Sequence, residues 1–359
     1  MPWNVRVTNC PLLLLGAVFL LCLAAWRQAL AECLSFQRTL MGTSVEVIAW
    51  CPDRDALQKA VEQAYAEIER IEHKLSIRNK NSEITEINRS AGKKPVRVDD
   101  EMYRLIRESK GFSRMSGGAF DISVQGLGDI WDFNRPGFQE PGPDEVQKGL
   151  DRVDYRKIRL NERDSTVFLQ EGGTEISLGG IAKGYAVDRA VGILRESGVE
   201  GGIVSAGGDL LAFGRKGNGE VWKVGIRNPR DHGKNICVLP VSNLAVATSG
   251  DYERYRMVDG ERVHHIIDPR TGYPSRGCMS VTVVAKSAVT ADALATAAFV
   301  LGPETGLALL EGLTDVEGIV VDSDGKITAS TGLAGEGGRP VDEKPERLDS
   351  HQKHNEVRN

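Results

Sequence analysis

The sequence predicts an α+β fold of mixed sheets with flanking helices, on three observations. Segments with the alternation of β-strands and segments with the 3.6-residue period of amphipathic helices both occur along the chain. They do not follow the regular strand–helix–strand order of a parallel α/β sheet. The 359 residues contain no internal repeat or obvious linker, and they suffice to bury a sizeable core. We therefore expect one large domain with inserted elements.

The N-terminal part of this domain is expected to hold one strand and two helices. Residues 44–50 alternate like a strand, and Asp53 can then cap a helix. The apolar positions of that helix are Leu57, Val61, Ala64, Ile68, Ile71 and Leu75. Residues 79–88 are polar and predict a loop, and a second helix is expected over residues 99–115. Its apolar side consists of Met102, Leu105, Ile106 and Phe112.

The middle of the chain is expected to be irregular before a third helix begins. Residues 126–150 are rich in Gly, Pro and aromatic residues, and short strands are expected between 153 and 178. A helix is predicted over residues 181–196, with Gly198 as its C-terminal cap. Its inward positions are Ala182, Tyr185, Ala190 and Leu194.

The C-terminal part consists mostly of short strands. They are predicted over residues 202–206, 221–227, 236–241, 244–248, 263–267 and 279–285. An Ala-rich helix is expected to start at Thr290. Residues 318–321 and 326–329 then predict a hairpin around Asp324-Gly325, because Asp-Gly favours the tight turn between antiparallel strands.

The first 31 residues have the features of a signal peptide. Arg6 precedes an apolar run over residues 11–26, and Ala29-Leu30-Ala31 matches the small-x-small cleavage rule. The run is short for a membrane span. An uncleaved anchor is the alternative, as is a lipoprotein acylated at Cys33, although Glu32 stands where that signal needs a small residue.

The domain proper is expected over residues 32–333. Residues 334–359 are charged and have few large apolar side chains, which predicts a disordered tail. Removal of residues 1–31 takes away two arginines and no acid, so the formal net charge moves from −5 to −7. This balance argues against nucleic acid as a partner. The cysteines that remain have no CxxC spacing and predict no zinc or redox site.

Residues 177–188 (SLGGIAKGYAVD) are the first segment with chemical meaning. A strand runs into a Gly-Gly pair and a helix follows at once, which points free backbone N–H groups at an anion such as phosphate. Lys183, in the first helical turn, can add a positive charge. A glycine turn that is tight for steric reasons alone explains the same pattern.

Asp292 and Thr296 form a second candidate pair. At positions i and i+4 they share one face of a helix, and carboxylate and hydroxyl oxygens suit Mg²⁺. The alternative is an Asp favoured by the helix dipole beside a buried Thr.

A strand with two adjacent histidines then leads into a turn that contains Asp268. His264 and His265 must face opposite sides of that strand, and a histidine near a carboxylate is common equipment for proton transfer. One of the two is therefore expected to face the interior or a cleft, and the other to face out. A capped turn beside two incidental histidines is the alternative. Acidic-glycine corners recur at residues 118–121, 207–209 and 249–251, which suggests that several of them meet at one polar ligand.

Taken together, these segments resemble the ApbE family of FAD:protein FMN transferases. The resemblance runs from about Thr39 to about Ser330. Its motifs occur in family order: MGTSVEV (41–47), SEITEIN (82–88), GGAFDISV (117–124), LGGIAKGYAVD (178–188), AGGDL (206–210), TSGDYER (248–254), HHIIDPRTGYP (264–274) and SVTVVAKSAVTADALATA (280–297).

The resemblance implies a site with FAD as substrate in a central cleft and Mg²⁺ at its pyrophosphate. The side chains of Asp292 and Thr296 and the carbonyl of Gly180 would hold the metal, and His265 with Asp268 would handle the proton. The FAD contacts would be Met41, Ala119, Phe120, Asp121, Lys183 and Ile266. Two departures bear on how FAD lies: Ser177 stands where the family often has Asp, and Arg78 where it often has an aromatic residue. A guanidinium can still stack on a ring.

The implied reaction is attack by a client threonine hydroxyl on the FMN-side phosphorus of FAD, with AMP as leaving group. The client would be an exported or membrane-anchored flavoprotein subunit of a respiratory complex, which places the enzyme in the periplasm or at the periplasmic face of the inner membrane. Two other functions fit the sequence: an Mg²⁺-dependent FAD pyrophosphatase, in which water replaces the threonine, and a flavin-binding carrier without turnover. The His265, Asp268 and Asp292 constellation argues against the carrier, because holding FAD requires neither a base nor a metal.

Overall fold

The computed structural model describes residues 33–128, 130–133, 135, 137–231 and 233–335. The predicted signal peptide and most of the predicted tail therefore lie outside the described residues. The last described helix, α9 (Thr331–Gly335), crosses the domain boundary that we predicted at residue 333. Within the described part of the chain, no helix has the length and apolar character needed to cross a bilayer.

A central antiparallel sheet forms the middle of the molecule. In the part of the chain that the structure describes, eight strands follow the order β1-β2-β6-β7-β10-β13-β14-β15. Their bounds are β1 Leu34–Leu40, β2 Thr43–Trp50, β6 Gly201–Ala206, β7 Asp209–Phe213, β10 Leu244–Gly250, β13 Cys278–Ala285, β14 Glu317–Asp322 and β15 Ile327–Ala329. The α+β class is confirmed, but the described strand pairs are antiparallel rather than mixed.

Three smaller sheets accompany the central one. They order as β3-β5-β4, β8-β9 and β11-β12 among the described residues. Their strands are β3 Val96–Arg97, β4 Ile158–Asn161, β5 Thr166–Leu169, β8 Trp222–Arg227, β9 Asn235–Val241, β11 Tyr255–Val258 and β12 Glu261–His264. The apolar residues of β8 and β9 pack on the central sheet at Ala212, Val246 and Val284, so this hairpin covers one sheet face.

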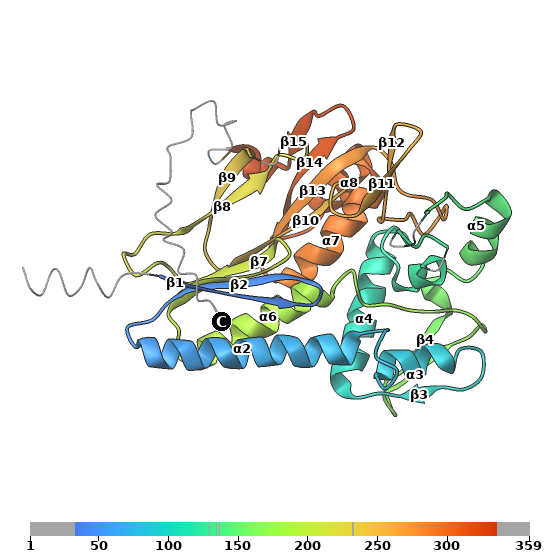
Figure 1. The fold of residues 1–359 in the computed structure, drawn as a ribbon, viewed down its shortest axis with the longest axis horizontal. Helices are drawn as coiled ribbons and strands as arrows, with labels where there is room; N and C mark the ends of the chain where they lie inside the picture. The colour runs from blue at the N-terminus through green and yellow to red at the C-terminus, as the bar shows by residue number, and fades with distance from the viewer. Residues whose placement is uncertain (1–32, 129, 134, 136, 232, 336–359) are drawn as a thin grey trace, which may run out of the picture.

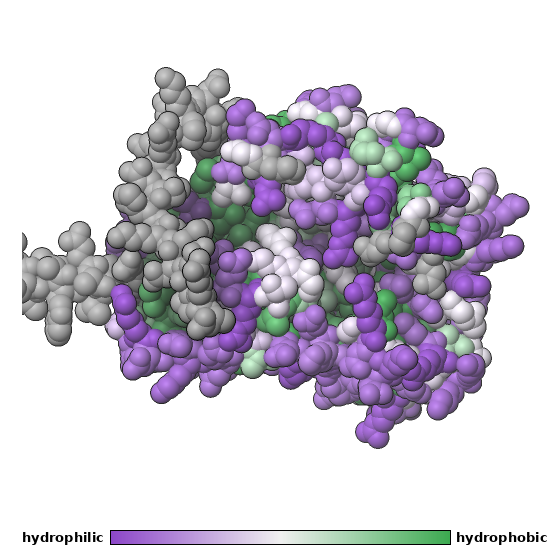
Figure 2. Space-filling model, in the orientation of Figure 1, coloured by the Kyte–Doolittle hydropathy of each residue, from purple (hydrophilic) through white to green (hydrophobic). Residues whose placement is uncertain are grey.

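Helices cover the opposite face, where the main core lies. The long helices α2 (Arg54–Leu75) and α6 (Ala182–Glu196) run beneath the sheet in Figure 1. The helix α7 (Ala288–Leu301) is buried nearly all round, as expected of a helix that is apolar on every side. The outer face of α2 is polar and forms much of the hydrophilic lower rim in Figure 2. This placement confirms its predicted Asp53 cap and apolar face.

The remaining helices gather at one end of the molecule (Figure 1). They are α3 (Glu83–Arg89), α4 (Asp100–Met115), the 3₁₀ turns η1 (Ile122–Leu127) and η2 (Tyr155–Lys157), and α5 (Pro143–Leu150). The helix α8 (Pro303–Glu311) follows α7 and lies against β14. The β11-β12 hairpin reaches toward the same end, and the candidate site lies there.

The structure corrects several predicted elements. The predicted loop at 79–88 contains α3, because the Ser82 side chain accepts the Thr85 N–H and thereby caps a short helix. The irregular stretch 126–150 ends in α5, whose first residue is a proline, a residue favoured at that position. The strand predicted over 263–267 ends at His264, and α7 starts two residues before Thr290. The strands β1, β3, β7 and β11 were missed.

Candidate active site

A cavity of about 690 Å³ opens between α3, η1 with the loop that follows it, and the end of β12. Its volume is in the range of small-molecule sites. Arg78, Arg89 and Arg254 line it together with His265 and Trp131. Two residues predicted from the sequence, Arg78 and His265, therefore meet at one cavity wall. The arginines make this cavity suitable for a polar, anionic ligand.

The two adjacent histidines lie in different environments, as expected. His264 is buried; its Nε2 is 2.9 Å from the carbonyl of Ser275, its Nδ1 accepts the Ile266 N–H, and its ring lies edge-on to Phe299. His265 follows the last residue of β12 and lines the cavity.

The contacts of His265 suit a proton acceptor. Its Nδ1 lies 3.2 Å from the Arg254 carbonyl oxygen, which can only accept a hydrogen bond, so the neutral ring carries its proton on Nδ1. The lone pair of Nε2 is then available. Although the cavity exposes part of the ring, partial burial lowers the pKa of His265 to about 4, and the positive charges of Arg254 and Lys183 contribute to this shift. His265 is therefore neutral at pH 7.

A second cluster joins Lys183 at the start of α6 to two buried carboxylates. The Lys183 ammonium is paired with Asp209 and lies 3.6 Å from Asp292 Oδ1. Asp209 also accepts the Thr248 N–H, and Asp292 Oδ2 accepts the Gly184 N–H at 3.0 Å. Two carboxylates and one ammonium leave the cluster one negative charge in excess, in an environment where uncompensated charge is costly.

The pKa shifts in this cluster reflect that imbalance. Burial raises the pKa of Asp292 well above its ordinary value, although Lys183 works against the shift. Burial alone would lower the pKa of Lys183, but Asp292 and Asp209 together raise it above its ordinary value. Lys183 therefore stays charged, and a cation beside Asp292 would offset the excess negative charge.

The residues predicted to hold a metal fit Mg²⁺ by their chemistry. Asp292 and Thr296 are four positions apart on α7, and the Thr296 hydroxyl lies 3.2 Å from that of Ser249. Gly184 lies in the first turn of α6, where an N–H has no acceptor within the helix, and its N–H donates to Asp292. Within the described residues, no backbone hydrogen bond reaches the Gly180 carbonyl. Carboxylate, hydroxyl and carbonyl oxygens are the ligands that Mg²⁺ prefers.

No group of three or more His, Cys, Asp or Glu side chains converges on a metal position in the described part of the chain. The predicted set has only one carboxylate, with a hydroxyl and a carbonyl, and is compatible with that finding.

Asp268 is not associated with His265. Its carboxylate accepts from the backbone N–H of Arg270 at 2.9 Å and from the guanidinium of the same residue at 2.9 and 2.7 Å. Its carbonyl accepts the N–H of Gly272 and closes the turn. The turn points this carboxylate at Arg270, and no hydrogen bond joins Asp268 to His265 among the described residues, so the catalytic role of Asp268 stays a prediction. Asp251, the acid of the 249–251 corner, is paired with Arg230 and Arg262.

Several other predicted FAD contacts make hydrogen bonds within the fold. Asp121 caps η1 by accepting from the backbone and hydroxyl of Ser123, and its other oxygen accepts the Tyr155 N–H at 2.7 Å. Burial raises the pKa of Asp121, and these three hydrogen bonds act against that shift. Both oxygens of the Asp121 carboxylate therefore accept hydrogen bonds from neighbouring residues of the chain.

Phe120 packs beneath the Gly-Gly pair, since a Cβ at Gly180 would lie 3.0 Å from its ring. Met41 has a positive φ of 55° in the β1–β2 turn, and its N–H binds Glu72. The Ser177 hydroxyl accepts the Gly179 N–H at 3.2 Å. The cavity-lining residues do not include these side chains, Ala119 or Ile266, so their contact with FAD stays a prediction.

Several residues of this region were not predicted as functional from the sequence. Asp209 was noted only as part of an acidic-glycine corner, yet its buried carboxylate holds Lys183. Arg89 and Arg254 were not singled out, although both line the cavity. An acid after two glycines at a strand start was the available signal for Asp209. Nothing in the local sequence indicated that α3 would point Arg89 at the cavity.

The chain matches known proteins over most of its length. The family model described as "ApbE family" matches residues 41–320. The FAD:protein FMN transferase of Treponema pallidum is 36% identical over 290 residues, which cover 76% of this chain and 80% of the relative. That of Klebsiella pneumoniae is 33% identical over 299 residues, covering 83% and 92%.

Solved structures agree with these sequence matches. The Thermotoga maritima ApbE protein superposes with a TM-score of 0.79 at 34% identity, covering 84% of this chain and 98% of that one. The flavin transferase ApbE of Vibrio cholerae gives a TM-score of 0.74 at 29% identity, covering 85% and 99%.

Proposed function

The chain belongs to the ApbE family, and from this premise we propose that it is a FAD:protein FMN transferase that uses Mg²⁺ to attach FMN to a threonine of a client protein. One observation supports the chemistry more than any other. The base candidate His265 stands at the wall of a cavity that Arg78 and Arg254 also line. A base and two cations suited to phosphate therefore share one cavity.

The chain's own residues have separate tasks in the proposed reaction. Arg78 and Arg254 at the cavity wall, together with Lys183, attract the phosphates of FAD. Asp209 keeps Lys183 charged and fixed in direction. The Nε2 atom of His265 accepts the proton of the client threonine hydroxyl.

The threonine oxygen then forms a bond to the FMN-side phosphorus. The anhydride bond breaks, and AMP departs with the electron pair. Asp292, Thr296 and the Gly180 carbonyl would hold Mg²⁺. When bound there, the metal would neutralise the pyrophosphate and stabilise the leaving phosphate.

Mass spectrometry of a client protein tests this function. The enzyme is incubated with FAD, Mg²⁺ and a candidate client, and a second sample omits the client. We expect the client to gain the mass of FMN on a threonine, and we expect one AMP to be released for each FMN attached. AMP release that is independent of any client would identify a pyrophosphatase. FAD binding without AMP in either sample would identify a carrier.

We also propose that the protein acts outside the cytoplasm, in the periplasm or at the periplasmic face of the inner membrane, on a flavoprotein subunit of a respiratory complex. The support is the sequence of residues 1–31. Fractionation of cells that express the full chain tests the location: activity confined to the cytosolic fraction would contradict it.

A further inference from the structure

The N-terminal turns of α6 and α7 exchange hydrogen bonds. The Gly184 N–H of α6 donates to the Asp292 carboxylate of α7 at 3.0 Å. In return, the Asp188 carboxylate of α6 accepts the N–H groups of Ala288 at 2.7 Å and Val289 at 2.9 Å. Donor and acceptor are three or four positions apart on each helix, so both lie on the facing side about one turn apart.

The two backbones are also in direct contact at this point. A Cβ placed on Gly184 would lie 2.2 Å from the Ala288 carbonyl oxygen and 2.8 Å from the Val289 Cα. These two atoms cannot move aside as a flexible side chain could, because both belong to the backbone of α7. The helices therefore meet at one fixed distance, and the reciprocal hydrogen bonds fix how they are rotated against each other.

Asp188 is not needed as an ordinary cap for α7. The helix has a cap of its own in Ser287, whose hydroxyl accepts the Thr290 N–H at 3.3 Å. The first N–H groups of a helix lack partners within it, and Asp188 takes up two more of them. It does so from a different helix, so this pair of bonds ties α7 to α6.

We propose that Asp188 is a positioning residue for the metal site. By anchoring the first turn of α7 to α6, it sets where Asp292 and Thr296 stand relative to Gly180 and Lys183. This inference rests on the proposed role of Asp292 and Thr296 as metal ligands.

The test measures metal binding directly, without turnover. Mn²⁺ is titrated into the purified full chain and free Mn²⁺ is followed by electron paramagnetic resonance, with and without ADP, which offers a pyrophosphate but no flavin. Asp188→Asn keeps the side-chain shape, but it has one acceptor oxygen and turns an NH₂ group toward a backbone N–H. We expect Mn²⁺ to bind about 10- to 100-fold more weakly, the usual effect of losing a group that orients a ligand.

Ser287→Ala is the matched control, because it removes a cap from the same helix end without cutting the link to α6. Both variants should melt somewhat below wild type, and the control should bind Mn²⁺ like wild type. Equal Mn²⁺ affinity of Asp188→Asn and wild type would overturn the inference, as would an equal loss in both variants. If wild type itself binds no Mn²⁺ with or without ADP, the proposed metal site fails, and the positioning role fails with it.

Discussion

At the scale of single residues, His264 and His265 have different surroundings although they are adjacent in the chain. One ring is buried between Ser275 and Phe299, and the other lines the cavity. Their substitution should therefore separate stability from catalysis.

We expect His265→Ala to lose about 10²- to 10⁴-fold in kcat, the usual contribution of a general base, while FAD affinity stays close to wild type. His264→Ala should instead lower the free energy of unfolding by about 1–3 kcal/mol, because it leaves buried partners unsatisfied. The folded fraction of His264→Ala should turn over normally. Steady-state kinetics of both variants measures the loss in kcat, and urea unfolding measures the loss in unfolding free energy. Full activity of His265→Ala would mean that another group accepts the proton.

The pH dependence of kcat/KM follows from the surroundings of His265. Because its pKa is lowered to about 4, the ring is unprotonated above that pH and can accept a proton throughout the range from 5 to 7. We expect kcat/KM to show no loss near pH 6.5 and to fall only as the pH approaches 4. A profile from pH 4 to 8, with folding checked by circular dichroism at each pH, measures this. An acidic limb centred near 6.5 in wild type and absent in His265→Gln would contradict it.

Asp292 is the residue on which the proposed metal site depends. Asp292→Asn keeps an oxygen that can accept the Gly184 N–H but removes the negative charge. We expect Mg²⁺-dependent turnover to drop more than about 100-fold, beyond the loss seen when only a supporting group is removed. The far-ultraviolet circular dichroism should stay that of wild type. Asp53→Asn, at the N-cap of α2, is the control and should keep full activity. Wild-type turnover of Asp292→Asn across a Mg²⁺ titration would exclude it as a ligand.

Residue types and spacing drew attention to the adjacent histidines and to the Asp292–Thr296 pair, and the family resemblance added Arg78. The structure places His265 and Arg78 at one cavity. Residue types and spacing were not enough for Asp268. The direction of that carboxylate depends on a turn in which Arg270, two residues later, folds back on it. A sequence shows which groups are near in the chain, but not which of them a turn brings into contact.

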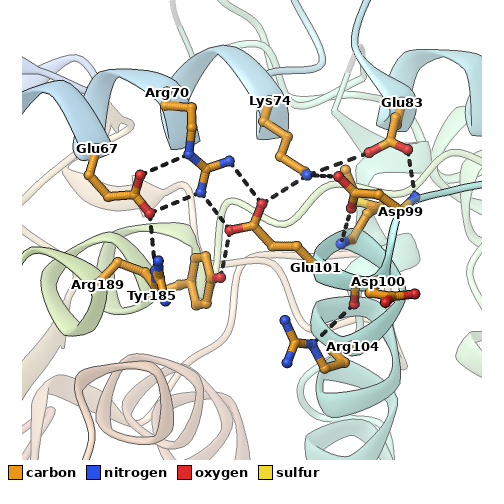
Figure 3. A network of polar contacts seen from close by, with 11 residues as sticks. Glu67, Arg70, Lys74, Glu83, Asp99, Asp100, Glu101, Arg104, Tyr185 and Arg189 are labelled. Carbon is orange, nitrogen blue, oxygen red and sulfur yellow. Dashed lines mark hydrogen bonds and ion pairs between the residues drawn. The ribbon is translucent and has the colours of Figure 1, made fainter. Parts of the chain in front are cut away.

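At the scale of elements, a network of charged side chains joins α2, α4 and α6 at the end of the molecule that holds the candidate site (Figure 3). Glu101 of α4 is its centre: it accepts from Arg70 at 2.9 and 2.7 Å, from Lys74 at 2.8 Å and from the Tyr185 hydroxyl at 2.7 Å. Glu67 of α2 adds a link to Arg189 of α6. Lys183 lies two positions before Tyr185 in α6, so the network also holds the helix that carries the candidate phosphate-binding lysine.

We expect Glu101→Gln to lower the free energy of unfolding by about 1–2 kcal/mol at pH 7, since three donors lose a charged acceptor while solvent partly screens Arg70. Glu62→Gln is the control. Its pair with Arg38 is exposed on both sides and should contribute less than about 1 kcal/mol. Urea unfolding measures both, and equal losses in the two variants would show that the network is no stronger than a surface ion pair.

The difference in unfolding free energy between wild type and Glu101→Gln should depend on pH. The hydrogen bonds from Arg70 are the largest cause that lowers the pKa of Glu101 below its ordinary value of 4.5. A carboxylate with a lowered folded-state pKa stabilises the fold above its unfolded-state pKa, and this contribution is lost as the pH falls through the folded-state value. The stability difference between wild type and Glu101→Gln should therefore be full at pH 7 and shrink below about pH 4.5.

The long elements were predictable because their periodicity covers many residues. The helix α2 has its buried positions where the 3.6-residue pattern put them. The helix α3 was missed because seven residues carry too little periodicity, and its Ser82 cap and buried Ile84 and Ile87 were the remaining signal. The histidine strand was predicted too long because Ile266 and Ile267 look like strand residues, although an isolated bridge from Ile267 to Pro274 replaces the ladder there.

At the scale of the whole molecule, the strand order could not be read from the sequence. β2 pairs with β6 across more than a hundred residues of intervening chain, and β10 lies between β7 and β13. Such distant pairings are decided by which apolar faces cover one another. Val45 and Val47 of β2 and Val204 of β6 share the helix-side core, whereas Val246 and Val284 face the β8-β9 hairpin. The α+β class needed only the local patterns, but the order of the strands needed the packed core.

The N-terminal edge of the sheet leads to a last prediction. Leu34 begins β1 shortly after the predicted cleavage point at Ala31, and β1 pairs with β2 along its whole length. A chain that starts at Glu32 should therefore fold, melt and turn over like the full chain. A chain that starts at Met41 lacks β1, which turns β2 with its buried Val45 and Val47 into an open edge.

We expect that shorter chain to melt lower and to aggregate, as measured by calorimetry and size-exclusion chromatography. Mass spectrometry of protein recovered from the native host should find Glu32 as the first residue. A native chain that begins at Met1 would show an anchor in place of a cleaved signal, and a lipid on Cys33 would show a lipoprotein. A chain from Glu32 that fails to fold would mean that the preceding residues are part of the domain.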